Sequence, residues 1–129
     1  LSCLEKLLLE CNNIKQLPQS IGNLKKLKVL DLFENLVTEI PESFYNLTNL
    51  VYLDLSSNYL KTLSTSIQNL TNLKSLFLSG NQLVSIPETI SELNNLDVLY
   101  LNYNNLTNIP SKINQLNLSM LSTVGNNLE

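Results

Sequence analysis

The chain copies one unit of 23 residues along its whole length. Leucine recurs at this interval without a slip, at Leu1, Leu24, Leu47, Leu70, Leu93 and Leu116. A fixed period of this size indicates a solenoid, because a single unit cannot bury its apolar side alone and must stack on its neighbours. We therefore expect residues 1–129 to form one domain of stacked copies.

Each copy begins with the pattern LxxLxLxxN. Five full copies end at Asn12, Asn35, Asn58, Asn81 and Asn104, and a sixth ends at Asn126 after 22 residues, with Thr123 in place of a leucine. Alternating leucines predict a short strand with one buried face. The apolar residues after the strand are expected to turn inward to the same core; they are Val37, Leu60, Leu83 and Leu106.

The second half of each copy predicts a short helical segment. It begins with proline at Pro18, Pro41, Pro87 and Pro110. Proline suits the first turn of a short helix or 3₁₀ segment, where its missing N–H leaves no bond unmade. Ser64 replaces it in the third copy. We expect this exception to loosen one outer turn.

These two patterns resemble the leucine-rich-repeat family over essentially the whole chain. The 23-residue period and the PxxIxxL segment are similar to the intracellular subclass of Ras-binding scaffolds and of repeat modules attached to kinases, phosphatases and adenylate cyclases. The resemblance implies an α/β solenoid, with a parallel β-sheet on the concave face and short helical or 3₁₀ turns on the convex face. Repeat arrays generally need polar caps. Since neither end shows one, we expect about five and a half repeats of a longer protein.

Asparagine closes every copy of the strand pattern. The six residues lie where the chain leaves the strand and bends, at Asn12, Asn35, Asn58, Asn81, Asn104 and Asn126. An amide side chain both donates and accepts, so it can bridge its own loop and the next copy's loop in a ladder. We interpret these asparagines as structural.

The variable strand positions are the candidate binding site, because they project from the concave face. Aromatic residues at these positions are Phe33, Tyr52, Phe77, Tyr100 and Tyr103, and the polar residues among them include Asp31, Glu34, Asp54 and Asn102. Aromatic anchors beside carboxylates resemble the core of a protein-binding surface. Two alternatives remain open. Aromatic residues also pack across strands when nothing binds, and Asp31 with Asp54 could be a solvated face.

The composition excludes several kinds of chemistry. The chain has no histidine, arginine or tryptophan. Its eight lysines are scattered along the sequence, and its net charge is −3. Ser-His-Asp and Cys-His catalysis, histidine metal clusters and arginine phosphate clamps are therefore absent. Asp31 and Asp54 would lie on an open sheet without a pocket that excludes water. We expect no enzyme activity, no cofactor, no metal site and no nucleic-acid partner.

The cysteines and hydropathy favour a cytoplasmic protein without membrane insertion. Cys3 and Cys11 are too few for a disulfide framework and are interpreted as reduced thiols. No apolar run approaches the roughly 18 residues that cross a bilayer. Glycosylation sequons begin at Asn46, Asn69, Asn105 and Asn117, and we attribute them to repetition in a sequence rich in Asn, Leu and Thr.

The leading functional hypothesis is a non-catalytic module that binds a protein partner, with a scaffold or targeting role. One alternative is a regulatory repeat segment of a larger signalling enzyme. Another is a secreted receptor ectodomain, in which Asn46 or Asn69 would carry a glycan and Cys3 would pair with Cys11.

Overall fold

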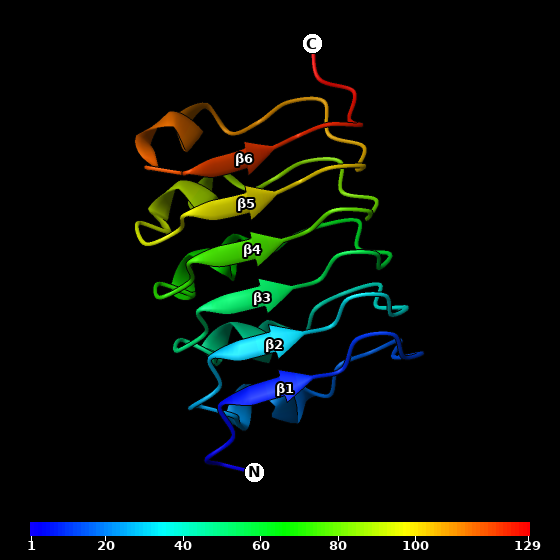
Figure 1. The fold of residues 1–129 in the computed structure, drawn as a ribbon, viewed down its shortest axis with the longest axis vertical. Helices are drawn as coiled ribbons and strands as arrows, with labels where there is room; N and C mark the ends of the chain where they lie inside the picture. Colours follow the sequence, from blue (N-terminus) through cyan, green and yellow to red (C-terminus); the bar gives the residue numbers. More distant parts are fainter.

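The computed structural model describes all residues 1–129 as a single stack of coils, each adding one strand to a common sheet (Figure 1). The strands are β1 (Lys6–Leu8), β2 (Val29–Asp31), β3 (Tyr52–Asp54), β4 (Ser75–Phe77), β5 (Val98–Tyr100) and β6 (Met120–Ser122). The 3₁₀ helices are η1 (Gln19–Asn23), η2 (Glu42–Asn46), η3 (Thr65–Asn69), η4 (Glu88–Glu92) and η5 (Ser111–Gln115). This arrangement confirms the predicted α/β solenoid. None of its helices has the length and apolar character needed to span a membrane.

All six strands are parallel and follow the order of the chain, so each coil pairs only with its neighbours. The register never slips, and Leu53 of β3 lies between Leu30 of β2 and Leu76 of β4. The shorter last copy is accommodated in the turn before β6. Leu116 there has ψ 141°, whereas Leu93 at the same position of the preceding coil has ψ 74°. The more extended backbone at Leu116 covers the distance that the missing residue would have covered. The strand β6 therefore keeps its register with β5.

The core is a column of leucines between the sheet and the 3₁₀ helices. Leu30, Leu53, Leu76 and Leu99, the middle residues of four strands, are fully buried. The return segments add Val37, Leu60, Leu83 and Leu106, which are also fully buried. Burying one such side chain contributes about 1.5–3 kcal/mol. The array is looser at its ends, where Leu4, Leu7, Leu9 and Ile14 of the first coil are only half-buried and Leu121 of β6 is exposed.

The 3₁₀ helices all start in the same way, including the one that lacks proline. Pro41 precedes η2 with φ −65° and ψ 145°, and Ser64 precedes η3 with φ −66° and ψ 147°. The Ser64 hydroxyl accepts a hydrogen bond from the Ser66 N–H at 3.0 Å. The expected loosening of this turn is therefore not found. The side-chain cap stabilises η3, which has the same length of five residues as the other 3₁₀ helices.

The ladder asparagines join each coil to the one before it. Nδ2 of Asn58 donates to the carbonyl of Leu32 in the preceding coil at 2.9 Å and to that of Leu55 in its own coil at 3.1 Å. Its Oδ1 accepts from the N–H of Val37 at 3.0 Å. The bridge thus runs to the preceding coil, and the predicted bridge to the next coil was wrong in direction.

The same bonding pattern recurs at Asn35, Asn81, Asn104 and Asn126. Asn12 lies in the first coil, is exposed, and donates only to carbonyls of its own loop. Four of these amides are almost fully buried, so they satisfy backbone groups that water cannot reach.

A second asparagine ladder, not among the residues predicted from the sequence, lies at the amino-terminal ends of the strands. Asn49, Asn72 and Asn95 donate through Nδ2 to carbonyls 24 residues earlier, at 2.7, 2.8 and 2.9 Å. They lie just before β3, β4 and β5 and are exposed. The signal was present in the sequence as an asparagine three residues before the first residue of each of these strands. Both ends of the strands are therefore joined by side-chain amides.

The residue before each ladder asparagine has a left-handed backbone conformation. These residues are Cys11, Glu34, Ser57, Gly80, Tyr103 and Gly125, with φ between 53° and 76°. The conformation lets the N–H of Ser57 reach the carbonyl of Ser79 at 2.8 Å in the next coil. A residue with a Cβ pays about 1–2 kcal/mol for it. The two glycines at this position were the sequence signal that could have revealed it.

Asn58→Ala should lower the free energy of unfolding by about 2–4 kcal/mol, because it leaves a buried N–H and buried carbonyls without partners. Asn12→Ala is the matched control, since Asn12 is exposed and reaches no other coil; its cost should stay below about 1 kcal/mol. Urea denaturation followed by circular dichroism measures both. Equal losses for the two variants would contradict the ladder.

Gly80→Ala should lower the free energy of unfolding by about 1–2 kcal/mol, because alanine is strained at positive φ. An added Cβ would also come within 3.3 Å of Ser57 Oγ. Ser57→Gly changes the same position of the preceding coil in the opposite direction. It should leave stability unchanged or raise it by at most about 1 kcal/mol, given the entropy that glycine loses on folding. Thermal melts of both variants test the sign.

Candidate functional site

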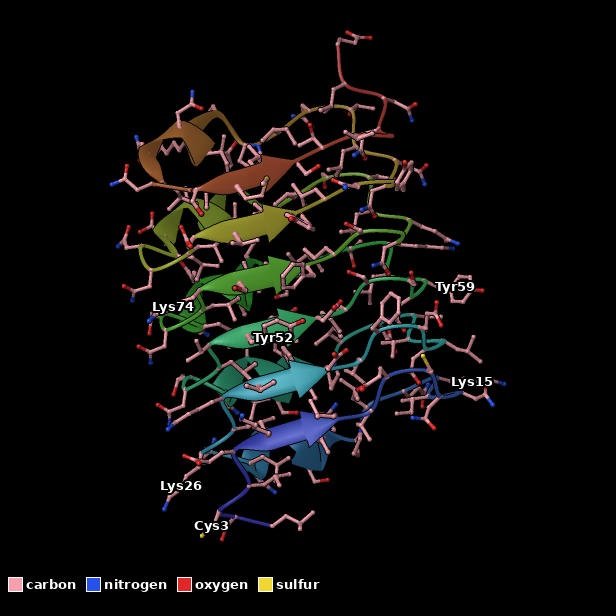
Figure 2. All side chains as sticks on the ribbon, viewed as in Figure 1. Cys3, Lys15, Lys26, Tyr52, Tyr59 and Lys74 are labelled. Atoms are coloured by element: carbon pink, nitrogen blue, oxygen red, sulfur yellow. The ribbon has the colours of Figure 1, made fainter.

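The outward residues of the strands form one open face, which we call the strand surface. In each three-residue strand the middle side chain points into the core and the two flanking side chains point out. One outward row contains Lys6, Val29, Tyr52, Ser75, Val98 and Met120, and the other contains Leu8, Asp31, Asp54, Phe77, Tyr100 and Ser122. Figure 2 shows Tyr52 in front of β3, on the side away from the 3₁₀ helices.

Three aromatic side chains meet at the middle of the strand surface; we call Tyr52, Phe77 and Tyr100 the aromatic cluster. The Tyr52 and Phe77 ring centroids are 5.3 Å apart at 46°. The Phe77 and Tyr100 centroids are 5.1 Å apart and nearly perpendicular at 88°. An aromatic pair in such an arrangement contributes about 0.5–1.5 kcal/mol beyond the area it buries. All three rings remain only half-buried, so each keeps an open side towards solvent.

Asp31 and Asp54 form an acidic pair directly across from each other on β2 and β3. Oδ1 of Asp31 accepts a hydrogen bond from the Phe33 N–H at 3.0 Å, and Oδ1 of Asp54 accepts one from the Ser56 N–H at 2.8 Å. Each carboxylate thus fixes the turn that follows its strand. Oδ2 of Asp31 remains without a hydrogen-bond partner in the chain, whereas the Ser56 side chain lies close to the Asp54 carboxylate.

No lysine neutralises the acidic pair. The one ion pair of the chain joins Lys28 Nζ to Glu5 Oε1 at 2.9 Å, and both side chains are exposed. Lys15, Lys26 and Lys74 lie along the two edges of the sheet, away from Tyr52 (Figure 2). The centre of the strand surface is therefore negatively charged and lacks a counter-ion from the protein.

This charge and partial burial act on the ionisable groups at the centre. Burial raises the pKa of Asp54 above its ordinary value, and the charge of Asp31 adds to the rise, although hydrogen bonds from Ser56 oppose it. Burial also raises the pKa of Tyr52, together with the nearby charges of Asp54, Asp31 and Glu10. No group of three or more cysteine or acidic side chains is arranged to hold a metal ion.

Four of the residues assigned to the site from sequence lie on the segments that follow the strands, outside the two outward rows. Phe33 and Glu34 follow β2, and the Glu34 carboxylate accepts a hydrogen bond from the Cys11 thiol at 3.4 Å, which raises the pKa of Cys11. Asn102 and Tyr103 follow β5. Oδ1 of Asn102 is buried without a hydrogen-bond partner.

Tyr103 has a left-handed backbone and makes no ring contact with the aromatic cluster. A Cβ built on Gly125 would lie 2.3 Å from Cδ1 of Tyr103, so this ring covers the glycine of the next coil. The structure therefore brings together five of the nine residues assigned to the site from sequence, namely Asp31, Tyr52, Asp54, Phe77 and Tyr100. It also adds Leu8, which is 59% exposed beside Asp31 and was not assigned to the site.

Comparison with known proteins agrees with the geometry of the coils. Residues 1–77 match the family model described as a leucine-rich repeat region, and residues 72–93 and 95–129 match the leucine-rich-repeat model. No curated protein sequence matches the chain. A solved leucine-rich-repeat protein of Leptospira interrogans is 39% identical with a TM-score of 0.92, over 95% of this chain and 32% of that protein.

Two solved plant structures are also similar. One is the ectodomain of an Arabidopsis thaliana membrane receptor kinase in complex with Casparian Strip Integrity Factor 2, 31% identical with a TM-score of 0.86, over 98% of this chain and 19% of that one. The other is the ectodomain of a second Arabidopsis thaliana receptor kinase, 28% identical with a TM-score of 0.84, over 95% of this chain and 71% of that one. The chain thus spans a third or less of the length of the Leptospira interrogans protein and of the first plant ectodomain. On its repeat pattern, its coil geometry and these matches, the chain belongs to the leucine-rich-repeat family.

Proposed function

We propose that this chain is a non-catalytic module that binds a protein partner on the strand surface, in a scaffold or targeting role. Leucine-rich-repeat domains are generally protein-interaction modules. The observation that carries the proposal is that the aromatic cluster lies next to an acidic pair without counter-ions, on a face that no other part of the chain covers. Aromatic anchors of this kind supply most of the binding energy in protein interfaces.

Core packing does not require these rings to lie on the outward side. The strands bury their middle leucines fully, so the sheet already has its apolar face without Phe77 and Tyr100. Half-exposed aromatic side chains on an open sheet promote aggregation unless a partner covers them. The plant ectodomain solved in complex with Casparian Strip Integrity Factor 2 supports binding by a related array of coils.

The absence of catalysis is part of the same proposal. Histidine and arginine are missing from the chain, and Asp31 and Asp54 each use one oxygen to hold a turn. The aspartates lie on an outward sheet row, where water has access to both carboxylates. General acid–base chemistry needs a group positioned against a reacting atom in a site that limits water.

A cytoplasmic setting and the intracellular, Ras-group-like subclass also remain proposals. The 23-residue period and the PxxIxxL segments support the subclass. Cys3 and Cys11 are free and exposed, and they lie before and after β1 in the chain. A three-residue strand alone spans roughly 10 Å, beyond the roughly 7 Å Cα separation that a disulfide tolerates. Two unpaired thiols fit a reducing compartment.

A secreted receptor ectodomain is the second candidate, favoured by the two plant ectodomains among the similar structures. Asn46 and Asn69 begin sequons at the ends of η2 and η3, and both are exposed. Expression through a eukaryotic secretory pathway, followed by endoglycosidase digestion, distinguishes the two settings. Quantitative glycan attachment with retained binding would favour the ectodomain, while misfolding or loss of partner capture on glycosylation would favour the cytoplasm.

Phe77→Ala combined with Tyr100→Ala should abolish capture of the partner from a cell extract, because it removes two of the three rings of the aromatic cluster. The loss of ring contacts should lower the free energy of unfolding by about 1–3 kcal/mol without unfolding the domain. Tyr59→Ala with Val84→Ala is the matched control, since these side chains are 47% and 55% exposed outside the strand surface. Mass spectrometry of the captured proteins provides the measurement, and undiminished capture by the first variant would refute the proposal.

Asp54→Asn should raise the free energy of unfolding at about pH 7, and the gain should shrink as the pH falls towards about 3. The raised pKa means that the folded chain holds the Asp54 proton more tightly than the unfolded chain does. Ionisation therefore costs stability as the pH rises through this pKa. Asp54→Ala is the control, because alanine cannot accept the Ser56 N–H and should be less stable than Asp54→Asn at both pH values. Urea melts at the two pH values decide it.

A further inference from the structure

We propose that the strand surface receives an extended segment of the partner in the polyproline II conformation. This segment carries a lysine or arginine over the acidic pair and a large apolar side chain, three residues away, over Phe77 and Tyr100. The inference rests on the proposed function and names the chemistry that the partner must present. It is carried by charge complementarity, by the open rings and by the spacing between them.

The acidic pair selects a cation. Oδ2 of Asp31 is free, no lysine pairs with either carboxylate, and the two residues are opposite each other on neighbouring strands. Neighbouring strands lie roughly 4.8 Å apart, so one ammonium or guanidinium group can contact both carboxylates. Tyr52 beside Asp54 offers a ring on which the apolar stem of a lysine or arginine can lie. Nucleic acid and acidic membranes are repelled by the same charges.

The aromatic pair selects an apolar side chain. Phe77 and Tyr100 pack edge to face with their centroids 5.1 Å apart, which fixes both rings in one arrangement. Rings that are already held together lose little side-chain entropy when a ligand covers them. A Leu, Met, Phe or Tyr side chain of the partner would bury the open sides of both rings at once.

The spacing of the two pairs selects the conformation. The acidic pair spans β2 and β3 and the aromatic pair spans β4 and β5, so their centres are two strand spacings, or roughly 9.6 Å, apart. In polyproline II, residues three apart share a face and are separated by roughly 9.3 Å. In a β-strand, residues that share a face are separated by roughly 6.7 or 13.4 Å, and the residue three away points to the other side.

The backbone of the sheet favours the same conformation. The strand N–H and C=O groups are already bonded to the neighbouring strands, so the strand surface offers side chains and few free backbone groups. A polyproline II segment makes no internal backbone hydrogen bonds and keeps its own backbone solvated. It can therefore lie across the strands without leaving buried polar groups unpaired, and proline pre-orders it before binding.

Fluorescein-labelled synthetic peptides test the spacing by fluorescence polarisation. The probes contain Lys-Pro-Pro-Phe or Phe-Pro-Pro-Lys between Gly-Ser flanks, and the matched control contains the same residues as Lys-Phe-Pro-Pro. At least one of the two orders should bind about tenfold more tightly than the control, since only the spaced peptides engage both pairs at once. Equal binding of all three peptides, or of none, overturns the inference.

Two variants assign the contacts. Asp31→Asn with Asp54→Asn should weaken the spaced lysine peptide about tenfold and leave unchanged a peptide with glutamine in place of lysine. Phe77→Ala with Tyr100→Ala should weaken the phenylalanine peptide and leave unchanged one with alanine in place of phenylalanine. Binding of the lysine peptide should also weaken as the pH is lowered, because protonation removes the charge of Asp54. A variant that weakens all peptides alike overturns the assignment.

The outcome is separable from that of the proposed function. If no spaced peptide binds, but the protein captures a partner that Phe77→Ala with Tyr100→Ala loses, the proposed function stands and the peptide chemistry is wrong. If neither peptide binding nor partner capture depends on these residues, both the proposed function and the peptide chemistry are wrong. Circular dichroism of each variant ensures that a lost signal reflects the surface and not unfolding.

Discussion

No coil of this chain can bury its leucines by itself, and every other feature of the structure depends on that constraint. The middle leucine of each strand is covered by the equivalent leucines of the coils before and after it. Burial of this kind is favourable only if neighbouring coils keep the same register, because a shift of one residue would turn the leucines outward. The half-buried leucines of the first coil and the exposed Leu121 of the last strand show the same constraint at the ends.

Polar side chains maintain that register where the backbone leaves the sheet. The ladder of Asn58 and its equivalents satisfies carbonyl and N–H groups of two coils at once, and the second ladder, of Asn49, Asn72 and Asn95, joins the coils at the other end of the strands. The left-handed residue before each ladder asparagine turns the chain sharply enough for this bridge to form. Glutamate, serine, tyrosine and cysteine all occupy the position, so the hydrogen bonds made there outweigh the strain.

The strand surface does not follow the repeat. Its outward rows change residue type from coil to coil, whereas the inward leucines do not. At Asp54, burial and the charge of Asp31 favour the neutral form, so ionisation near neutral pH costs stability. A residue that destabilises its own fold while ionised is a common feature of functional sites. The proposed cationic ligand would reverse that cost, because an opposite charge lowers the pKa of the carboxyl group.

The sequence by itself determined the solenoid, the strand positions, the inward leucines and the short helical turns, because all of these follow from a local pattern copied at a constant interval. It also determined which side chains face outward, since alternation along a strand needs no knowledge of the partner strand. Only the tertiary structure decided which outward residues meet. Tyr52 of β3 reaches Phe77 diagonally on the neighbouring strand β4, while Tyr103, three residues after Tyr100, lies over Gly125. The contact between Tyr52 and Phe77 depends on the register between coils, which no single copy of the repeat contains. The placement of Tyr103 depends on contact with the next coil and on a left-handed conformation that a non-glycine residue does not signal in the sequence.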